Sequence, residues 1–211
     1  VQVALDYLGL NEMITITEQQ MQNVPKMKGN LGLAARNTIV VEDLIASMLL
    51  NGSTDAAFII TDEVMKKAAT QSFGSLMVQK AEQLGMTATD YSNCDGTGLS
   101  NVDTTAIDQY KLYINLLKNE ELSPIFTKGK YIVQSRSEHK NVNIAEKINN
   151  NVAAMIPGNN YFDSRMKAAS SCSVDASKSS YVYCFHAQEE KRDVVFIFRT
   201  EKASTSLRLG L

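Results

Sequence analysis

Serine and lysine side chains at short spacing could support acyl transfer, because a lysine amine can take the proton of a serine hydroxyl and make it a nucleophile. Two Ser-x-x-Lys strings occur in the chain, at Ser137–Lys140 and Ser164–Lys167. With 18 serines and 15 lysines in 211 residues, about 1.3 such strings arise by chance. Neither string stands at a predicted helix start before an apolar run, so we treat both as accidental.

The three cysteines allow at most one internal disulfide, because one thiol must be left over. Cys172 and Cys184 flank a predicted turn at 174–180 and could face each other across a hairpin. That arrangement fits a disulfide and equally fits two buried thiols in neighbouring strands, so both alternatives stay open. Together with His139 and His186, these cysteines match no compact zinc spacing. Neither a metal site nor a cofactor is predicted.

The composition is that of an ordinary globular protein. The chain has 211 residues, a formal net charge of -2, 44% hydrophobic and 21% charged residues, which excludes disordered and fibrous classes. With 21 basic and 23 acidic residues, it has no sequence-wide positive field for a nucleic acid or an anionic membrane. Apolar runs such as Leu44–Leu50 are shorter than the roughly 18 residues of a membrane span. The length predicts one domain over residues 1–211.

Four segments have the apolar spacing of helices. They are Asp43–Leu50, Asp55–Ala69, Phe73–Leu84 and Asp103–Lys118. Gly52 and Gly85 stand where the first and third of them should end, Gly85 in the place of a left-handed cap. Asp103 or Thr104 is the predicted N-cap of the last.

The last third of the chain changes to short β-branched and aromatic runs that are typical of strands. These runs are Tyr131–Val133, Tyr161–Phe162, Tyr181–Phe185 and Val194–Phe198. The final two should pair as an antiparallel hairpin through the charged segment 188–193. Polar, turn-forming stretches at 19–30 and 87–101 predict loops. Helices followed by antiparallel strands indicate an α+β fold.

Several strings occur in the order of a known family. They are Asn11–Thr17 for the strand "DEVVTVT", Val40–Ile45 for the helix entry "TVEDLL", Asp55–Ala57 for "GNDAA", Phe73–Met86 for "F…MN…AKELGM" and Asp95–Ser100 for "HGL…ST". By these strings the chain resembles the serine-type D-Ala-D-Ala carboxypeptidases, the low-molecular-mass penicillin-binding proteins, from about residue 4 to 118 and more weakly through the final strands. The resemblance implies a β-lactamase/transpeptidase-like fold, in which a helical cluster packs on an antiparallel sheet.

Enzymes of that family use three motifs. A Ser-x-x-Lys at a helix start carries the nucleophile and its base, a Ser-x-Asn loop relays protons and orients the substrate amide, and a Lys-Thr-Gly strand binds the substrate carboxylate. Val1–Leu8 resembles the tail of the helix that the first motif begins. The resemblance therefore implies that the nucleophile and the N-terminal part of the fold precede residue 1.

The second motif is altered, because Gly52-Ser53-Thr54 stands where the family has Ser-Gly-Asn. Gly52 has no hydroxyl to relay a proton, and Thr54 lacks the amide that both donates and accepts hydrogen bonds. A slip of one residue would place Ser53 and Asp55 in the two roles at the expense of the flanking match. Both alignments stay open.

The third motif is altered too. The string Arg165–Ser170 stands where the family has "GIKTGYT", so that Lys167 remains while Ala168 and Ala169 replace the threonine and the glycine. A substrate carboxylate would find two methyl groups in place of a hydroxyl and open space. Lys167 either binds an anion or is a solvated charge on a strand edge.

These changes predict a catalytically impaired carboxypeptidase homologue that acts as a binding or structural module at the cell wall, outside the cytoplasmic membrane. Its expected partner is a peptidoglycan stem peptide or another cell-wall protein. The alternative is an active serine D,D-carboxypeptidase whose nucleophile lies upstream of residue 1; a related β-lactamase is a weaker third. The candidate catalytic residues are Ser53 and Lys167, and the candidate substrate-binding positions are Gly52, Thr54, Asp55, Ala168 and Ala169.

Overall fold

A computed structural model describes residues 1–25, 30–91, 94, 104–137, 142–173, 179–187 and 191–200. Its helices are α1 (Gln2–Leu5), α2 (Glu18–Asn23), α3 (Val41–Asn51), α4 (Thr54–Lys67), α5 (Phe73–Gln83), α6 (Ala106–Lys118), α7 (Ser123–Phe126) and the 3-10 helix η1 (Ala153–Met155). Its strands are β1 (Met13–Thr15), β2 (Asn37–Val40), β3 (Lys130–Ser137), β4 (Val142–Asn149), β5 (Met166–Ser173), β6 (Ser179–Ala187) and β7 (Arg192–Thr200). Within these ranges no helix has both the length and the apolar character to cross a membrane.

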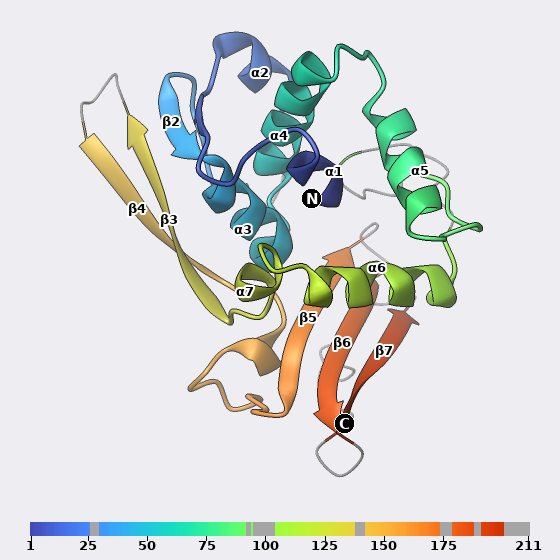
Figure 1. The fold of residues 1–211 in the computed structure, drawn as a ribbon. Coiled ribbons are helices and arrows are strands. Elements are labelled where there is room, and N and C mark those ends of the chain that lie inside the picture. The colour runs from blue at the N-terminus through green and yellow to red at the C-terminus, as the bar shows by residue number, and fades with distance from the viewer. Residues whose placement is uncertain are drawn as a thin grey trace.

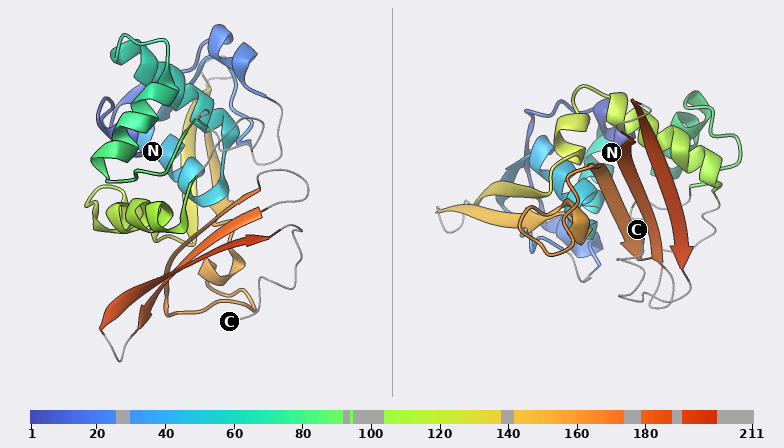
Figure 2. Two further views of the ribbon diagram at one scale, coloured as in Figure 1. Left: turned by 90° about the vertical axis from the view of Figure 1, so that its right-hand side faces the viewer. Right: turned by 90° about the horizontal axis from the view of Figure 1, so that it is seen from below.

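The strands form two antiparallel sheets, which confirms the predicted α+β class. One sheet has the order β1-β2-β3-β4 and the other the order β5-β6-β7. In Figure 1 the helices α1 to α5 gather above the second sheet, while the β3–β4 hairpin extends to one side. Figure 2 shows from two further directions that α6 lies against the β5–β7 sheet.

Helix α3 forms the centre of the hydrophobic core. Its side chains Leu44, Ile45 and Leu50 are completely buried, and removal of such surfaces from water is the main drive for folding. The same cluster takes side chains from both sheets, among them Val133, Ile148, Ala168 and Cys184. One core therefore holds both sheets against α3.

Two glycines end helices as the sequence predicts. Gly52 follows α3 with φ 67°, and Gly85 follows α5 with φ 71°, both in the left-handed region that favours glycine. The start of α6 differs from the prediction. Thr105 is its N-cap and accepts a hydrogen bond from the Asp108 N–H at 3.2 Å, so Thr104 is not the cap, and the predicted cap Asp103 lies outside the described residues.

Helix α2 falls in a stretch that the sequence analysis assigned to a loop. Thr17 Oγ1 accepts from the Gln20 N–H at 3.2 Å, and Gln20 Oε1 accepts from the Thr17 N–H at 2.8 Å. This capping box satisfies two N–H groups at the helix start. Gln20 Nε2 then donates to Asp62 and Glu63 of α4 at 2.7 and 2.6 Å. The Thr-x-x-Gln string was the sequence signal for this helix.

The predicted strand at Tyr161–Phe162 is wrong, because these residues form a turn. Asn159 Oδ1 accepts from the Tyr161 N–H, and Asn159 O accepts from the Phe162 N–H, both at 3.0 Å. Such local bonds compete with strand pairing. The predicted β6–β7 pairing is confirmed, with Phe185 opposite Val194.

A disulfide between Cys172 and Cys184 is also ruled out. The β5–β6 register places Cys172 opposite Ser180 and Cys184 opposite Ala168. Four residues of strand separate Ser180 from Cys184, roughly 13 Å at the usual rise, whereas a disulfide needs Cα atoms closer than about 7 Å. Cys184 is a buried thiol in the core.

Candidate functional site

The residues of the altered second motif join α3 to α4. Gly52 ends α3 with φ 67° and ψ 38°, a conformation that a residue with a Cβ adopts only at a cost. Ser53 is the N-cap of α4, and its side chain is 2% exposed. Thr54 is the first residue of α4 and is also buried. All three therefore have a structural part in the turn between two core helices.

The Asp55 side chain is the centre of a buried hydrogen-bond network at this turn. Its carboxylate accepts the backbone N–H groups of residues 31–33 at 3.1 to 3.3 Å, the Ala56 N–H at 3.0 Å and the Ser53 hydroxyl. A carboxylate offers about four lone-pair positions, so these bonds leave no position for a substrate. The pair that a slipped alignment joins, Ser53 and Asp55, does meet in the structure. It meets as a buried contact that ties the 31–33 segment to α4.

The altered third motif lies on β5, an outer strand of its sheet. The register passes from the Met166–Phe185 pair to the Ala168–Cys184 pair, so Lys167 is the extra residue of a β-bulge and its side chain is exposed. Bulges re-aim a side chain locally and are common beside active sites. The resemblance placed a Lys at this position, and the structure presents it to solvent.

The two alanines of this motif are packed more tightly than the sequence analysis expected. Ala168 and Ala169 are both 1% exposed. Ala168 belongs to the main core, whereas Ala169 packs with Val152, Met155 and Tyr183 in a second cluster. Their methyl groups therefore fill the protein interior on the two sides of the strand and do not line an open edge.

A short loop after β4 links the two motif regions. The Asn151 N–H donates to Leu50 O at 2.7 Å, close to the end of α3. Asn150 Nδ2 donates to Ala169 O at 3.2 Å, and Asn150 Oδ1 accepts from the Val152 N–H at 2.8 Å. Asn150 is buried, so these bonds form without competing water. The loop brings the second-motif and third-motif regions together although more than a hundred residues separate them along the chain.

A buried carboxylate supports the site from behind by joining α3 to β3. Asp43 Oδ2 accepts from the Gln134 N–H at 2.6 Å, and Asp43 Oδ1 accepts from the Tyr131 hydroxyl at 2.9 Å. Burial raises the pKa of the Asp43 carboxyl, while these two hydrogen bonds oppose that rise. Burial and the neighbouring carboxylates of Asp43 and Glu42 raise the pKa of Tyr131. This cluster positions the strand, and the Tyr131 hydroxyl stays protonated.

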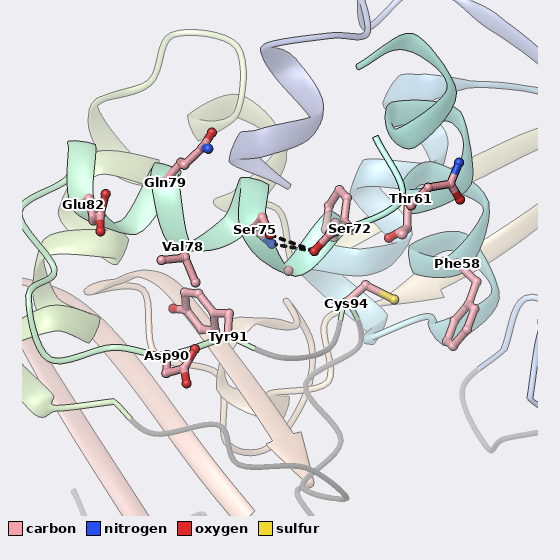
Figure 3. Close-up of a pocket in the computed structure, with 13 residues that line it drawn as sticks. Phe58, Thr61, Ser72, Ser75, Val78, Gln79, Glu82, Asp90, Tyr91 and Cys94 are labelled. Carbon is pink, nitrogen blue, oxygen red and sulfur yellow. Dashed lines mark hydrogen bonds between the residues drawn. The ribbon is translucent and has the colours of Figure 1, made fainter. Parts of the chain in front are cut away.

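A cavity of about 790 Å³ lies between α4, α5 and the segment that leads to Cys94. Figure 3 shows Phe58 and Tyr91 among its aromatic walls and Glu82 and Asp90 as its charged groups. No basic side chain lines it among the described residues, so it suits a neutral or cationic polar ligand better than a carboxylate. None of the predicted site residues lines this cavity.

Sequence reasoning missed Asn150, Asn151 and Asp43. The run Asn149-Asn150-Asn151, three amides between two apolar residues, was a visible signal of a polar junction. Asp43 had no such signal, because an acidic residue in the first turn of a helix is common on electrostatic grounds alone.

Comparison with known proteins agrees with this geometry. A family model described as D-alanyl-D-alanine carboxypeptidase matches residues 1–160. A comparison with curated proteins finds no match.

Among solved structures, the DD-transpeptidase of Streptomyces K15 is similar with a TM-score of 0.79 at 17% identity, covering 96% of this chain and 77% of that chain. A D-alanyl-D-alanine carboxypeptidase from Mycobacterium tuberculosis H37Rv is similar with a TM-score of 0.75 at 17% identity, covering 97% of this chain and 71% of that chain. At these identities the likeness concerns the fold. It confirms the penicillin-binding and β-lactamase-like fold that the sequence strings implied. Because the family model also spans most of the chain, this protein belongs to the D-alanyl-D-alanine carboxypeptidase family.

Proposed function

We propose that this protein is a catalytically impaired D-Ala-D-Ala carboxypeptidase homologue that serves as a binding or structural module. The observation that carries the proposal is the closed network at the second motif. The Ser53 hydroxyl donates to Asp55, whose carboxylate is saturated by backbone N–H groups. A proton relay needs a hydroxyl that can exchange its proton with the substrate, and here that exchange would require breaking a buried hydrogen bond.

The third motif supports the same conclusion. Ala168 and Ala169 offer no hydroxyl, and their carbon atoms are enclosed by other apolar groups. Loss of one polar contact to a developing charge costs about 10²-fold in rate in other acyl-transfer enzymes. Two altered motifs in one site therefore favour loss of turnover more than a change of substrate. Exposed Lys167 keeps one group that can attract a carboxylate.

The family relationship also supports a location and a partner. We place the protein outside the cytoplasmic membrane, in the cell envelope or secreted. Its partner there is a peptidoglycan stem peptide, or another cell-wall protein that recognises the carboxypeptidase fold. Binding without turnover would suit a protein that retains the fold of the family.

The test is covalent labelling of the full-length protein by a fluorescent penicillin, because penicillins acylate the active serine of this family. We expect no labelled band under conditions in which an active family member is labelled. A band that unlabelled penicillin removes would overturn the proposal. In that event, Ser53→Ala and Lys167→Ala variants would show whether the motif positions described above carry the activity.

The alternative function is an active D,D-carboxypeptidase with its Ser-x-x-Lys upstream of residue 1. This reading predicts labelling that survives Ser53→Ala, because the acylated serine would lie elsewhere. The labelling experiment therefore separates the two functions directly.

A further inference from the structure

A groove of about 630 Å³ lies at the base of the β3–β4 hairpin. Its apolar surface comes from Tyr131 and Ile132 of β3 and from Ile148 of β4. Ile132 is 51% exposed, so an apolar side chain borders the groove in contact with water. The Tyr131 ring is held in place by the hydrogen bond from its hydroxyl to Asp43 at 2.9 Å. The groove thus has an aliphatic side and a fixed aromatic side before any ligand binds.

Three lysines, Lys128, Lys130 and Lys147, surround this apolar surface. Lys128 Nζ lies 4.7 Å from the centroid of the Tyr131 ring, a cation–π distance. Lys130 Nζ donates to Pro157 O at 3.3 Å, which uses one of its three N–H groups. In the part of the chain that the structure describes, no carboxylate forms an ion pair with any of the three lysines.

The strand register places two of these charges on one face. Lys130 stands opposite Asn149, and Ile132 stands opposite Lys147. Lys130 and Lys147 are therefore diagonal neighbours with backbones roughly 7 to 8 Å apart, and Ile132 shares their face. The chain as a whole has a net charge of -2, so this cluster of positive charge is a local feature. The carboxylate nearest to Lys128, that of Asp43, already binds Tyr131 and Gln134.

We propose that this groove binds an acidic peptide segment of a partner protein. An apolar side chain of the peptide lies against Ile132 and the Tyr131 ring, and carboxylates on either side of it bind Lys130 and Lys147. Charge complementarity selects an acidic ligand, and the apolar surface selects a peptide over a small inorganic anion. The proposal goes beyond the proposed function, since it holds whether or not the protein turns over a substrate.

A competing explanation for these lysines is protection of an edge. Strand β4 is the outer strand of its sheet, and lysines on edge strands block pairing with other chains. On that explanation the lysines would repel further strands without recognising a ligand. The experiment must therefore measure binding and self-association together.

The probe is the blocked tetrapeptide Glu-Leu-Glu-Glu, and the matched control is Gln-Leu-Gln-Gln. We expect NMR titration of the intact protein to show shifts at the Ile132 methyl groups with the acidic peptide. Binding of the neutral peptide should be at least about tenfold weaker, and added salt should weaken only the acidic one. Equal binding of the two peptides, or no binding by either, would overturn the proposal.

Variants then assign the contacts. Lys130→Gln with Lys147→Gln should weaken binding of the acidic peptide by about tenfold or more, and Ile132→Ser should weaken both peptides. Lys118→Gln, an exposed lysine at the end of α6, is the matched control and should leave binding unchanged. If the double variant keeps its affinity and instead self-associates in sedimentation, the lysines only protect the edge and the proposal is wrong.

Discussion

The hydroxyl of Ser53 donates a hydrogen bond to the carboxylate of Asp55, and both side chains are buried at the turn between α3 and α4. In the aligned family this region orients the substrate and relays protons. Here it anchors the 31–33 segment to the start of α4. The same polar groups that could serve chemistry are thus committed to holding the fold.

Replacing Asp55 with Ala should lower the free energy of unfolding by about 3 kcal/mol. The change leaves the N–H groups of 31–33 and the Ser53 hydroxyl without their acceptor. Urea unfolding measures the loss. Asp6→Asn, which removes only a partly exposed ion pair with Lys80, is the control and should cost less than about 1 kcal/mol. Equal losses in the two variants would contradict the assigned role of Asp55.

Gly52→Ala should cost about 1 kcal/mol of stability. The penalty comes from the left-handed backbone at φ 67°, because a Cβ there would meet only Asn151 Nδ2 at an ordinary 3.8 Å. Gly9→Ala is the matched control, since Gly9 has open space and no positive φ. Thermal or urea unfolding of both variants checks the prediction, and a loss of the same size at Gly9 would refute it.

Asn150→Ala should cost about 2 kcal/mol, because it leaves the Ala169 carbonyl and the Val152 N–H unsatisfied in the interior. Asn149, the next residue, is exposed, and its change to Ala should have little effect. The comparison by urea unfolding tests whether the loop after β4 holds the two motif regions together. A neutral Asn150→Ala variant would show that it does not.

Local signals made the helix ends predictable, whereas the site depended on distant contacts. Gly52 and Gly85 end their helices through their own backbone freedom, so the sequence alone located them. Asn150 acts through Ala169 and Val152, and only the folded chain brings Asn151 to Leu50. No periodicity or local motif encodes such a contact.

The errors have equally local causes. Tyr161–Phe162 has the composition of a strand, but the Asn159 side chain offers a nearer partner for the backbone. The Cys172–Cys184 pairing failed because the hairpin register offsets the two residues by four positions, and register depends on the whole face of a strand.

The Asp43 carboxyl should titrate above the ordinary range of an aspartate, because burial disfavours its charged form. Removing the donor in Tyr131→Phe should raise this pKa further. Carbon-13 NMR of the carboxyl group measures both values, with Tyr161→Phe, an exposed tyrosine, as the control. A wild-type value in the ordinary range, or a fall in Tyr131→Phe, would be inconsistent with the observed burial.

The sign of the accompanying stability change follows from the raised pKa. The folded state holds the Asp43 proton more tightly than the unfolded state does. The contribution of this group to stability is therefore fully present below the unfolded pKa and is lost as the pH rises through the folded pKa. Wild type should thus lose stability relative to Asp43→Asn over that interval, as urea unfolding at a series of pH values would show.

The most direct test of catalytic impairment is the release of D-alanine from a peptide that ends in D-Ala-D-Ala. The full-length protein is incubated with the peptide beside an active carboxypeptidase, and free D-alanine is measured over time. We predict release no faster than in a heat-inactivated sample, because the second motif is closed and the third lacks its hydroxyl. Steady release that penicillin abolishes would contradict this account and establish an active enzyme.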